Sequence, residues 1–311
     1  PEQLALLVTT RYRPGGGAEN IKYYKLTADI YINDVTSSLW AEKIGCLDWF
    51  SQWVNGAYIT NSHINFDGDG HVIFGLYYDH TQGAVEYVRI ALFPVLCEYS
   101  TIQNVGLSDA YVSGVVGNPD IADSVGGFVS CCEDFDQYLG LDSHDGPGNL
   151  VKLQDPENGY EEKALKFKNC FIDHRSYISG RYTGGFIASP YSAPILENCV
   201  FTGAVGGEGD KYYTGTFTGT DSTCGTQLRY CLSSSVTADA RIIAGSNGST
   251  WRTNPAYNVT FATGVYYFST TMSYGGYYTR LSNPNDRIGE QAREKMSEFD
   301  WENTWRTVDG G

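Results

Sequence analysis

The chain has 311 residues, of which 41% are hydrophobic and 18% are charged. This balance excludes an intrinsically disordered chain, and the lack of any run of 18 or more apolar residues excludes a transmembrane helix. With 21 Lys and Arg against 36 Asp and Glu, the formal net charge is −15, so a nucleic-acid partner is not expected. This acidity predicts a soluble extracellular protein and is also compatible with calcium binding.

The first elements are expected in residues 1–76, which we predict to form an N-terminal cap and the first strands. The strands are expected in YYKLTADIYIND and in ITNSHINFDGDGHVIFGLYY. Asp67 and Asp69 superficially resemble a calcium loop, but the distal ligands are missing and the alternation with Gly favours a tight turn. Because the chain starts at Pro1, we expect a mature or trimmed part of a longer protein.

Four segments between residues 100 and 246 share one pattern. Each joins an apolar-x-Asn-apolar motif, or its remnant, to a strand that contains Gly and Phe or their substitutes. The matching positions are Asn104, Asn169 and Asn198, then Val105, Cys170, Cys199 and Cys231, and then Gly126-Gly127-Phe128, Gly184-Gly185-Phe186 and Gly215-Thr216-Phe217. Val105 and the three cysteines are 65, 29 and 32 residues apart, so the first gap holds an insertion or a degenerate repeat.

The apolar residues of each repeat alternate, which predicts short, half-buried strands. A repeat of about 30 residues made only of strands cannot bury its own apolar face, whereas stacked repeats bury a continuous interior. The sequence therefore predicts an all-β fold, a right-handed parallel β-helix (β-solenoid) that forms one domain over residues 1–311. A β-propeller is the alternative, but its blades are longer and need four strands. In the solenoid, the matching Asn and Cys residues would form ladders.

Eight cysteines are present: Cys46, Cys97, Cys131, Cys132, Cys170, Cys199, Cys224 and Cys231. An even number in a secreted protein suggests disulfides, but no CxxC spacing occurs. Because Cys170 and Cys199 occupy the same repeat position, we favour free, buried thiols there.

Residues 131–164 break the repeat pattern and predict a polar loop that leaves the solenoid. Its sequence includes LDSHDGPGN, where Asp142, His144 and Asp145 combine two carboxylates with an imidazole. Such a group would suit acid–base catalysis, and Asp142 and Asp145 would suit Ca²⁺. A solvated acidic loop without a site is the interpretation that we favour.

The C-terminal region contains many tyrosines and one predicted helix. If Tyr266, Tyr267, Tyr274, Tyr277 and Tyr278 face outward, they offer rigid rings to a sugar or a protein; the alternative is packing inside the last strands. Residues 284–311 are expected to cap the solenoid. The helix is predicted over 284–298, with Ile288, Ala292 and Met296 on one face.

The order of these segments resembles the GLUG-motif β-helix modules of bacterial secreted and cell-surface proteins. The likeness rests on YYKLTADIYIND with NFDGDGH, on the repeats from Asn169-Cys170 and Asn198-Cys199, and on the closing segment WENTW at 301–305. Such modules accompany IgA-specific metallopeptidases and occur in adhesins. The resemblance implies a stalk, spacer or adhesive surface rather than a catalyst.

Complete catalytic motifs are missing, because the sequence has no HExxH, no G-x-S-x-G and no P-loop. The first hypothesis is therefore a non-catalytic extracellular module, secreted or attached to the cell surface, that binds a glycan or a protein of a host or bacterial surface. The second is a lyase or glycosidase that uses the carboxylates of the 131–164 loop, and the third is a subunit that self-associates into filaments. We expect no cofactor, with a calcium ion in the loop as the alternative, and no insertion into membranes.

Overall fold

The computed structural model describes residues 1–9, 22–49, 63–79, 89–97, 99–114, 124–133, 164–190, 194–206, 214–219, 226–235, 241–243, 261–263, 265–268, 279–281, 283 and 289–302. In these segments the chain is mostly β, and its strands pair in parallel. The helices described are α1 (Glu2–Thr9), α2 (Ser38–Glu42) and α5 (Gly289–Lys295). The expected all-β class with parallel strands is confirmed.

The strands form four sheets, here named A to D. Sheet A contains, in order, β1 (Lys22–Lys25), β3 (Ile64–Asp67), β8 (Thr101–Gln103), β13 (Lys166–Lys168), β18 (Ile195–Glu197), β22 (Gln227–Arg229) and β25 (Phe261–Thr263). Sheet B contains β2 (Ile30–Tyr31), β4 (Val72–Phe74), β9 (Gly106–Ser108), β14 (Phe171–Ile172), β19 (Val200–Phe201), β23 (Leu232–Ser233), β26 (Tyr266–Phe268) and β27 (Thr279–Leu281).

Sheet C contains β6 (Arg89–Ile90), β11 (Ser124–Gly126), β16 (Tyr182–Gly184), β21 (Thr214–Thr218), β17 (Ile187–Pro190), β12 (Val129–Glu133) and β7 (Phe93–Cys97), with β24 (Arg241–Ile243) paired to β21. Sheet D contains β20 (Ala204–Gly206), β15 (Tyr177–Ser179), β10 (Tyr111–Ser113) and β5 (Tyr77–Asp79).

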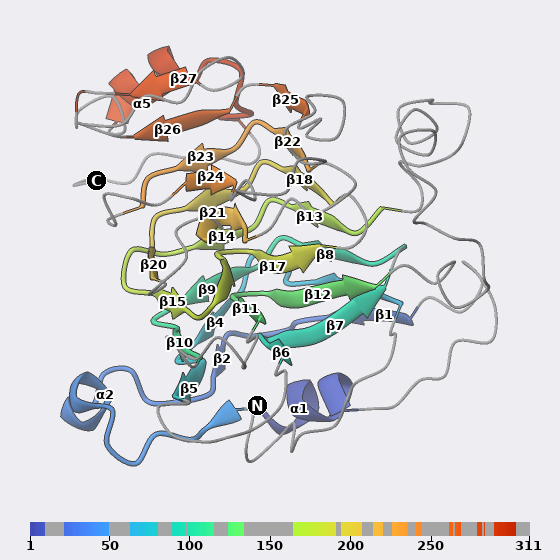
Figure 1. Cartoon of the computed structure of the whole chain (residues 1–311), viewed down its shortest axis with the longest axis vertical. Helices are drawn as coiled ribbons and strands as arrows, with labels where there is room; N and C mark the ends of the chain where they lie inside the picture. Colours follow the sequence, from blue (N-terminus) through green and yellow to red (C-terminus); the bar gives the residue numbers. More distant parts are fainter. Residues whose placement is uncertain are drawn as a thin grey trace.

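The chain visits the sheets in one repeated order, A, B, D and then C, and each such passage is called a circuit below. The circuit β8–β12 is followed by β13–β17, whose strands pair directly on it. Successive circuits form tiers from the blue N-terminal helices to the red α5 (Figure 1). Because β13 pairs with β8 without an intervening strand, the long first gap holds an insertion and not a degenerate repeat.

The insertion begins later than predicted. Residues 131–133 belong to strand β12, and Cys131 and Cys132 are buried. The prediction failed there because two adjacent cysteines were counted with the acidic residues that follow, whereas they continue a core strand. Ala164, at the other end, is also buried.

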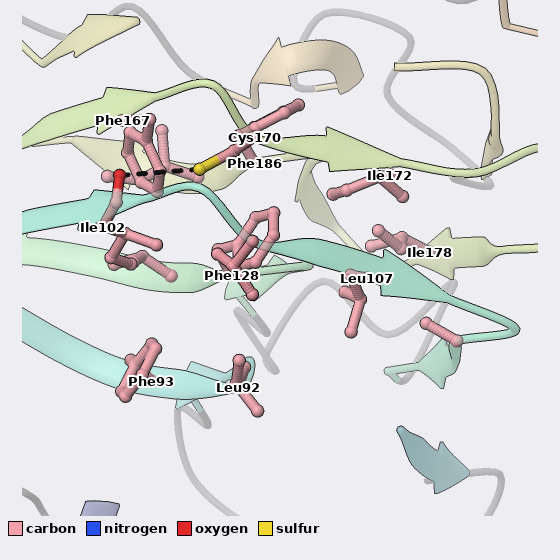
Figure 2. Packing of buried hydrophobic residues seen from close by; sticks show 14 of the residues in the cluster. Leu92, Phe93, Ile102, Leu107, Phe128, Phe167, Cys170, Ile172, Ile178 and Phe186 are labelled. Atoms are coloured by element: carbon pink, nitrogen blue, oxygen red, sulfur yellow. Dashed lines mark hydrogen bonds between the residues drawn. The ribbon is translucent and has the colours of Figure 1, made fainter. Parts of the chain in front are cut away.

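The interior is filled by side chains that repeat from circuit to circuit. Phe128, Phe186 and Phe217 are fully buried, with ring centroids 5.4 Å apart for the first pair and 5.6 Å for the second. Phe167 packs edge-on against Phe186 at 5.7 Å, next to Ile102 (Figure 2). Gly185 is required beside these rings because an added Cβ would meet the Thr216 carbonyl.

Short helices lie near both ends of the stack (Figure 1). Leu4 and Ala5 of α1 are buried in the main core, and Trp40 of α2 is buried. Neither of these helices was predicted, because each is short and the N-terminal region was interpreted as strands and a cap. Within the described segments, no helix has both the length and the apolar character to cross a bilayer.

The C-terminal helix was predicted over 284–298 and runs over Gly289–Lys295, so it begins later and ends earlier than expected, and Ile288 lies outside the described residues. Ala292 and Met296 are buried together in a small second core with Leu232, Tyr266 and Phe299. The helix therefore packs on the outer face of sheet B, on the side of β26 opposite Tyr267 and the main core.

Candidate functional site

The predicted acidic site lies outside the described residues. Asp142, His144 and Asp145 all fall in the stretch between Glu133 and Ala164 that the structure leaves undescribed, so their catalytic and calcium-binding roles stay predictions. In the parts of the chain that are described, no group of three or more His, Cys, Asp or Glu side chains is arranged to hold a metal ion.

Of the five tyrosines proposed for a binding surface, Tyr266 and Tyr267 of β26 lie within the described residues. Tyr266 is 6% exposed and Tyr267 is 2% exposed. Adjacent strand residues face opposite sides, and both sides of β26 are covered: Tyr267 points into the main core, and Tyr266 packs against Phe299 at 5.8 Å. These two rings are therefore packing residues and present no face to a ligand, while Tyr274, Tyr277 and Tyr278 lie outside the described residues.

The predicted asparagine ladder is confirmed. Asn104, Asn169 and Asn198 all adopt left-handed backbone conformations, with φ of 52°, 53° and 52°. The Asn198 amide donates to Asn169 Oδ1 at 3.2 Å, and the Asn169 amide donates to Asn104 Oδ1 at 2.8 Å. The Asn104 amide then donates to Asp67 Oδ1 at 3.0 Å, so the ladder ends on a carboxylate. Asn suits both roles, because it tolerates this backbone and carries a donor and an acceptor.

The predicted cysteine ladder is confirmed as a column of free, buried thiols. Cys170, Cys199 and Cys231 are each 0% exposed and form no disulfide. Each thiol donates to a carbonyl of the previous circuit, as in the 3.5 Å bond from Cys170 to Ile102 (Figure 2). Burial is the main reason that the pKa of the Cys199 thiol is raised well above its ordinary value. Such thiols pack as small apolar groups and are poor nucleophiles.

A network of charged and hydroxyl groups links the turns after β9 and β14. Asp173 accepts hydrogen bonds from the Ser108 hydroxyl at 2.8 Å and from Arg175 Nε at 3.0 Å. Arg175 also pairs with the buried Asp109 at 3.0 Å, and the Ser176 hydroxyl donates to Asp173 at 2.9 Å. Burial raises the pKa of the Asp173 carboxyl, but the hydrogen bonds from Ser108 and Arg175 outweigh this effect and hold that pKa below its usual value.

Asp173, His174 and Arg175 follow strand β14, which ends at Ile172, and they form a turn. In this turn Arg175 reaches both Asp173 and Asp109 of the preceding circuit.

Sheet D carries a ladder of tyrosines on its outer side. Tyr77, Tyr111 and Tyr177 occupy matching positions on β5, β10 and β15, with ring centroids 5.8 Å and 5.6 Å apart. Lys43 Nζ lies 4.0 Å from the centroid of the Trp40 ring and 5.3 Å from that of Tyr111. Desolvation lowers the pKa of the Lys43 ammonium. Because neighbouring rings cover one another, this surface offers mainly ring edges and hydroxyls.

A groove opens on the outer face of sheet A, over β1, β3 and β8. It encloses about 330 Å³ and is lined by Tyr23, Asn65 and Thr101 in one column and by Lys25, Asp67 and Gln103 in the next. Tyr23 is 77% exposed. The volume is at the small end of the range of about 300–1,000 Å³ typical of small-molecule sites. Among the described residues, we take this groove as the best candidate for a binding site.

Sequence reasoning missed both the tyrosine ladder and the groove. Tyr111 and Tyr177 stand in matching repeat stretches, AYVSG and SYISG, so the sequence carried a signal for the ladder. No such signal marks the groove, because its residues differ from strand to strand. They become neighbours only through the register that pairs Tyr23 with Asn65 and Asn65 with Thr101.

Comparisons with known proteins give a distant structural similarity and no family. No protein-family model matches the chain, and no curated protein matches it. Among solved structures, the chain is similar to a Bacteroides ovatus protein proposed to be an immunoglobulin A1 protease. The TM-score is 0.41 and the identity 17%, over 90% of this chain and 76% of that one. A similarity of this size assigns neither an activity nor a site to the chain.

Proposed function

We propose that the chain is a right-handed β-solenoid that acts as a non-catalytic extracellular module, a spacer or adhesive surface that binds a glycan or a protein. The repeated order of sheets and the ladders that join successive circuits support the solenoid. A rigid stack of this kind holds surface residues at fixed spacing, which suits display rather than conformational change.

The non-catalytic part of the proposal rests on the lowered pKa values of two carboxyl groups. A general acid needs a carboxyl group whose pKa is raised towards neutrality. The carboxyl groups of Asp67 and Asp173 have the opposite property. Each accepts several hydrogen bonds that outweigh the effect of burial and lower its pKa. Groups held in this way stabilise the turns between strands, and their lowered pKa keeps them ionised at neutral pH, where a general acid must carry a proton.

The test is turnover on a panel of plant, mucin and microbial polysaccharides, measured as new reducing ends. We expect none, together with binding of the intact protein to at least one glycan or surface protein. Cleavage that is abolished by Asp142→Ala or Asp145→Ala would overturn the proposal and establish the enzyme. Purified Asp109→Asn protein is the matched control, because that change alters a carboxylate of the structural network.

A further inference from the structure

The groove over β1, β3 and β8 contains two columns of side chains, which differ in how fully their polar groups are hydrogen-bonded within the protein. Tyr23, Asn65 and Thr101 lie on neighbouring strands in one register position, and Lys25, Asp67 and Gln103 lie two residues further along. Neighbouring strands are about 4.8 Å apart, so the side chains within each column follow one another across three strands at about that spacing, which is close to the width of a sugar ring.

The second column is fixed by its own contacts. Asp67 Oδ1 accepts from the Asp69 backbone N–H at 2.9 Å and from Asn104 at 3.0 Å, and Oδ2 accepts from Gln103 at 3.1 Å. Lys25 pairs with Asp69 at 3.0 Å. These bonds make one wall of the groove rigid and use the carboxylate of Asp67 within the protein.

The first column contains an unsatisfied polar atom. Asn65 Oδ1 is buried and has no hydrogen-bond partner. Leaving such an acceptor unpaired costs about 1–3 kcal/mol, and native proteins rarely do so without a reason. The Asn65 side chain lines the groove, so a rotation of its amide would bring this oxygen to a hydroxyl group that enters the groove.

Tyr23 supplies the other half of a sugar site. Its ring is the most exposed large hydrophobic side chain among the described residues, at 77%, and it stands directly beside Asn65 in the register. An exposed ring next to amide and hydroxyl groups suits a ligand with one apolar face and a rim of hydroxyls, which is the chemistry of a pyranose ring.

The charges favour a neutral sugar over an acidic one. Asp67 lines the groove, Asp69 lies beside it, and Lys25 is already paired with Asp69. The chain as a whole carries −15, so a uronate, sialate or sulfated residue would be repelled.

We propose that this groove binds a neutral sugar residue, stacked on Tyr23 and hydrogen-bonded to the Asn65 amide. The proposal rests on the function proposed above and specifies the ligand class for the described part of the chain. It assigns Tyr23 and Asn65 to binding and Asp67 to the support of the groove wall.

The experiment titrates the intact chain with methyl glycosides of neutral hexoses and N-acetylhexosamines, and with glucuronate and sialate, by NMR and calorimetry. We expect saturable binding of at least one neutral glycoside and weaker or no binding of the acidic ones. Tyr23→Ala and Asn65→Ala should each weaken binding about tenfold or more. Tyr31→Ala is the matched control, because Tyr31 is another exposed tyrosine, 54% accessible, on an N-terminal strand outside the groove.

Three results would overturn the groove site: no neutral glycoside binds, an acidic glycoside binds more tightly, or Tyr31→Ala weakens binding as much as Tyr23→Ala. Each of these leaves the proposed non-catalytic role standing, since a protein ligand fits that role as well. Release of new reducing ends is a separate readout, and it would sink the proposed function instead. Unchanged melting temperatures of the variants show that any loss of binding is not unfolding.

Discussion

Strand β8 shows two ways in which a stack of parallel strands uses its residues. On its inner face, Ile102 is fully buried and lies next to rings that recur from circuit to circuit. On its outer face, Thr101 and Gln103 line the groove together with unlike residues of β1 and β3. The like residues of the asparagine column satisfy one another, whereas the column of Tyr23, Asn65 and Thr101 leaves Asn65 Oδ1 without a hydrogen-bond partner.

The largest difference between the two faces should appear in stability. Phe186→Ala removes a fully buried ring between Phe128 and Phe217, and we expect it to lower the free energy of unfolding by about 3–5 kcal/mol. Tyr23→Ala removes a ring that is 77% exposed, and the change should stay within about 0.5 kcal/mol. Urea-induced unfolding followed by circular dichroism measures both.

Phe186→Leu is the control for the first variant, since it keeps most of the volume and should cost clearly less than Phe186→Ala. Equal losses for Phe186→Ala and Tyr23→Ala would contradict the distinction between a structural interior and a ligand-binding outer face.

A smaller effect is expected for the asparagine ladder. Asn169→Ala puts an ordinary side chain at φ 53° and removes bonds to both Asn104 and Asn198, so we expect a loss of about 2–4 kcal/mol. Asn169→Gly keeps the backbone relaxed and removes only the ladder bonds, so its loss should be about half as large. The comparison uses the same unfolding measurement. If Gly is as damaging as Ala, the left-handed conformation contributes nothing and the ladder alone is responsible.

The same distinction explains what the sequence could and could not predict. The register of the circuits was predictable because Asn and Cys recur at one position, and the pairing of Lys168 with Glu197 places Cys170 beside Cys199 as expected. The groove was not predictable, because Tyr23 and Asn65 share no motif and meet only after the strands have paired.

Local sequence was also insufficient where tertiary contacts decide the structure. The tyrosines of β26 were compatible with either a surface or packing in the last strands, and packing is observed, because α5 covers one side of that strand and the main core covers the other. The α1 segment carries only a short apolar run, and its helix is identified by the burial of Leu4 and Ala5 against the stack.

The smallest expected effect concerns pH and the network around Asp173. The pKa of Asp173 is lower in the folded chain than in the unfolded chain, where it is about 3.9. The network therefore stabilises the fold fully above that value, and the contribution is lost as the pH falls through the lower, folded pKa. Asp173→Asn should cost stability at pH 7, and the difference from the unmodified chain should shrink as the pH is lowered below about 4. Glu42→Gln, which removes an exposed carboxylate of α2, is the control and should show no such convergence. Urea unfolding from pH 7 to pH 3 measures the effect. If the free energies of unfolding of Asp173→Asn and the unmodified chain differ by the same amount over that range, the Asp173 carboxylate does not carry the network's stability. The hydroxyl groups of Ser108 and Ser176 and the backbone of the turn would then do so instead.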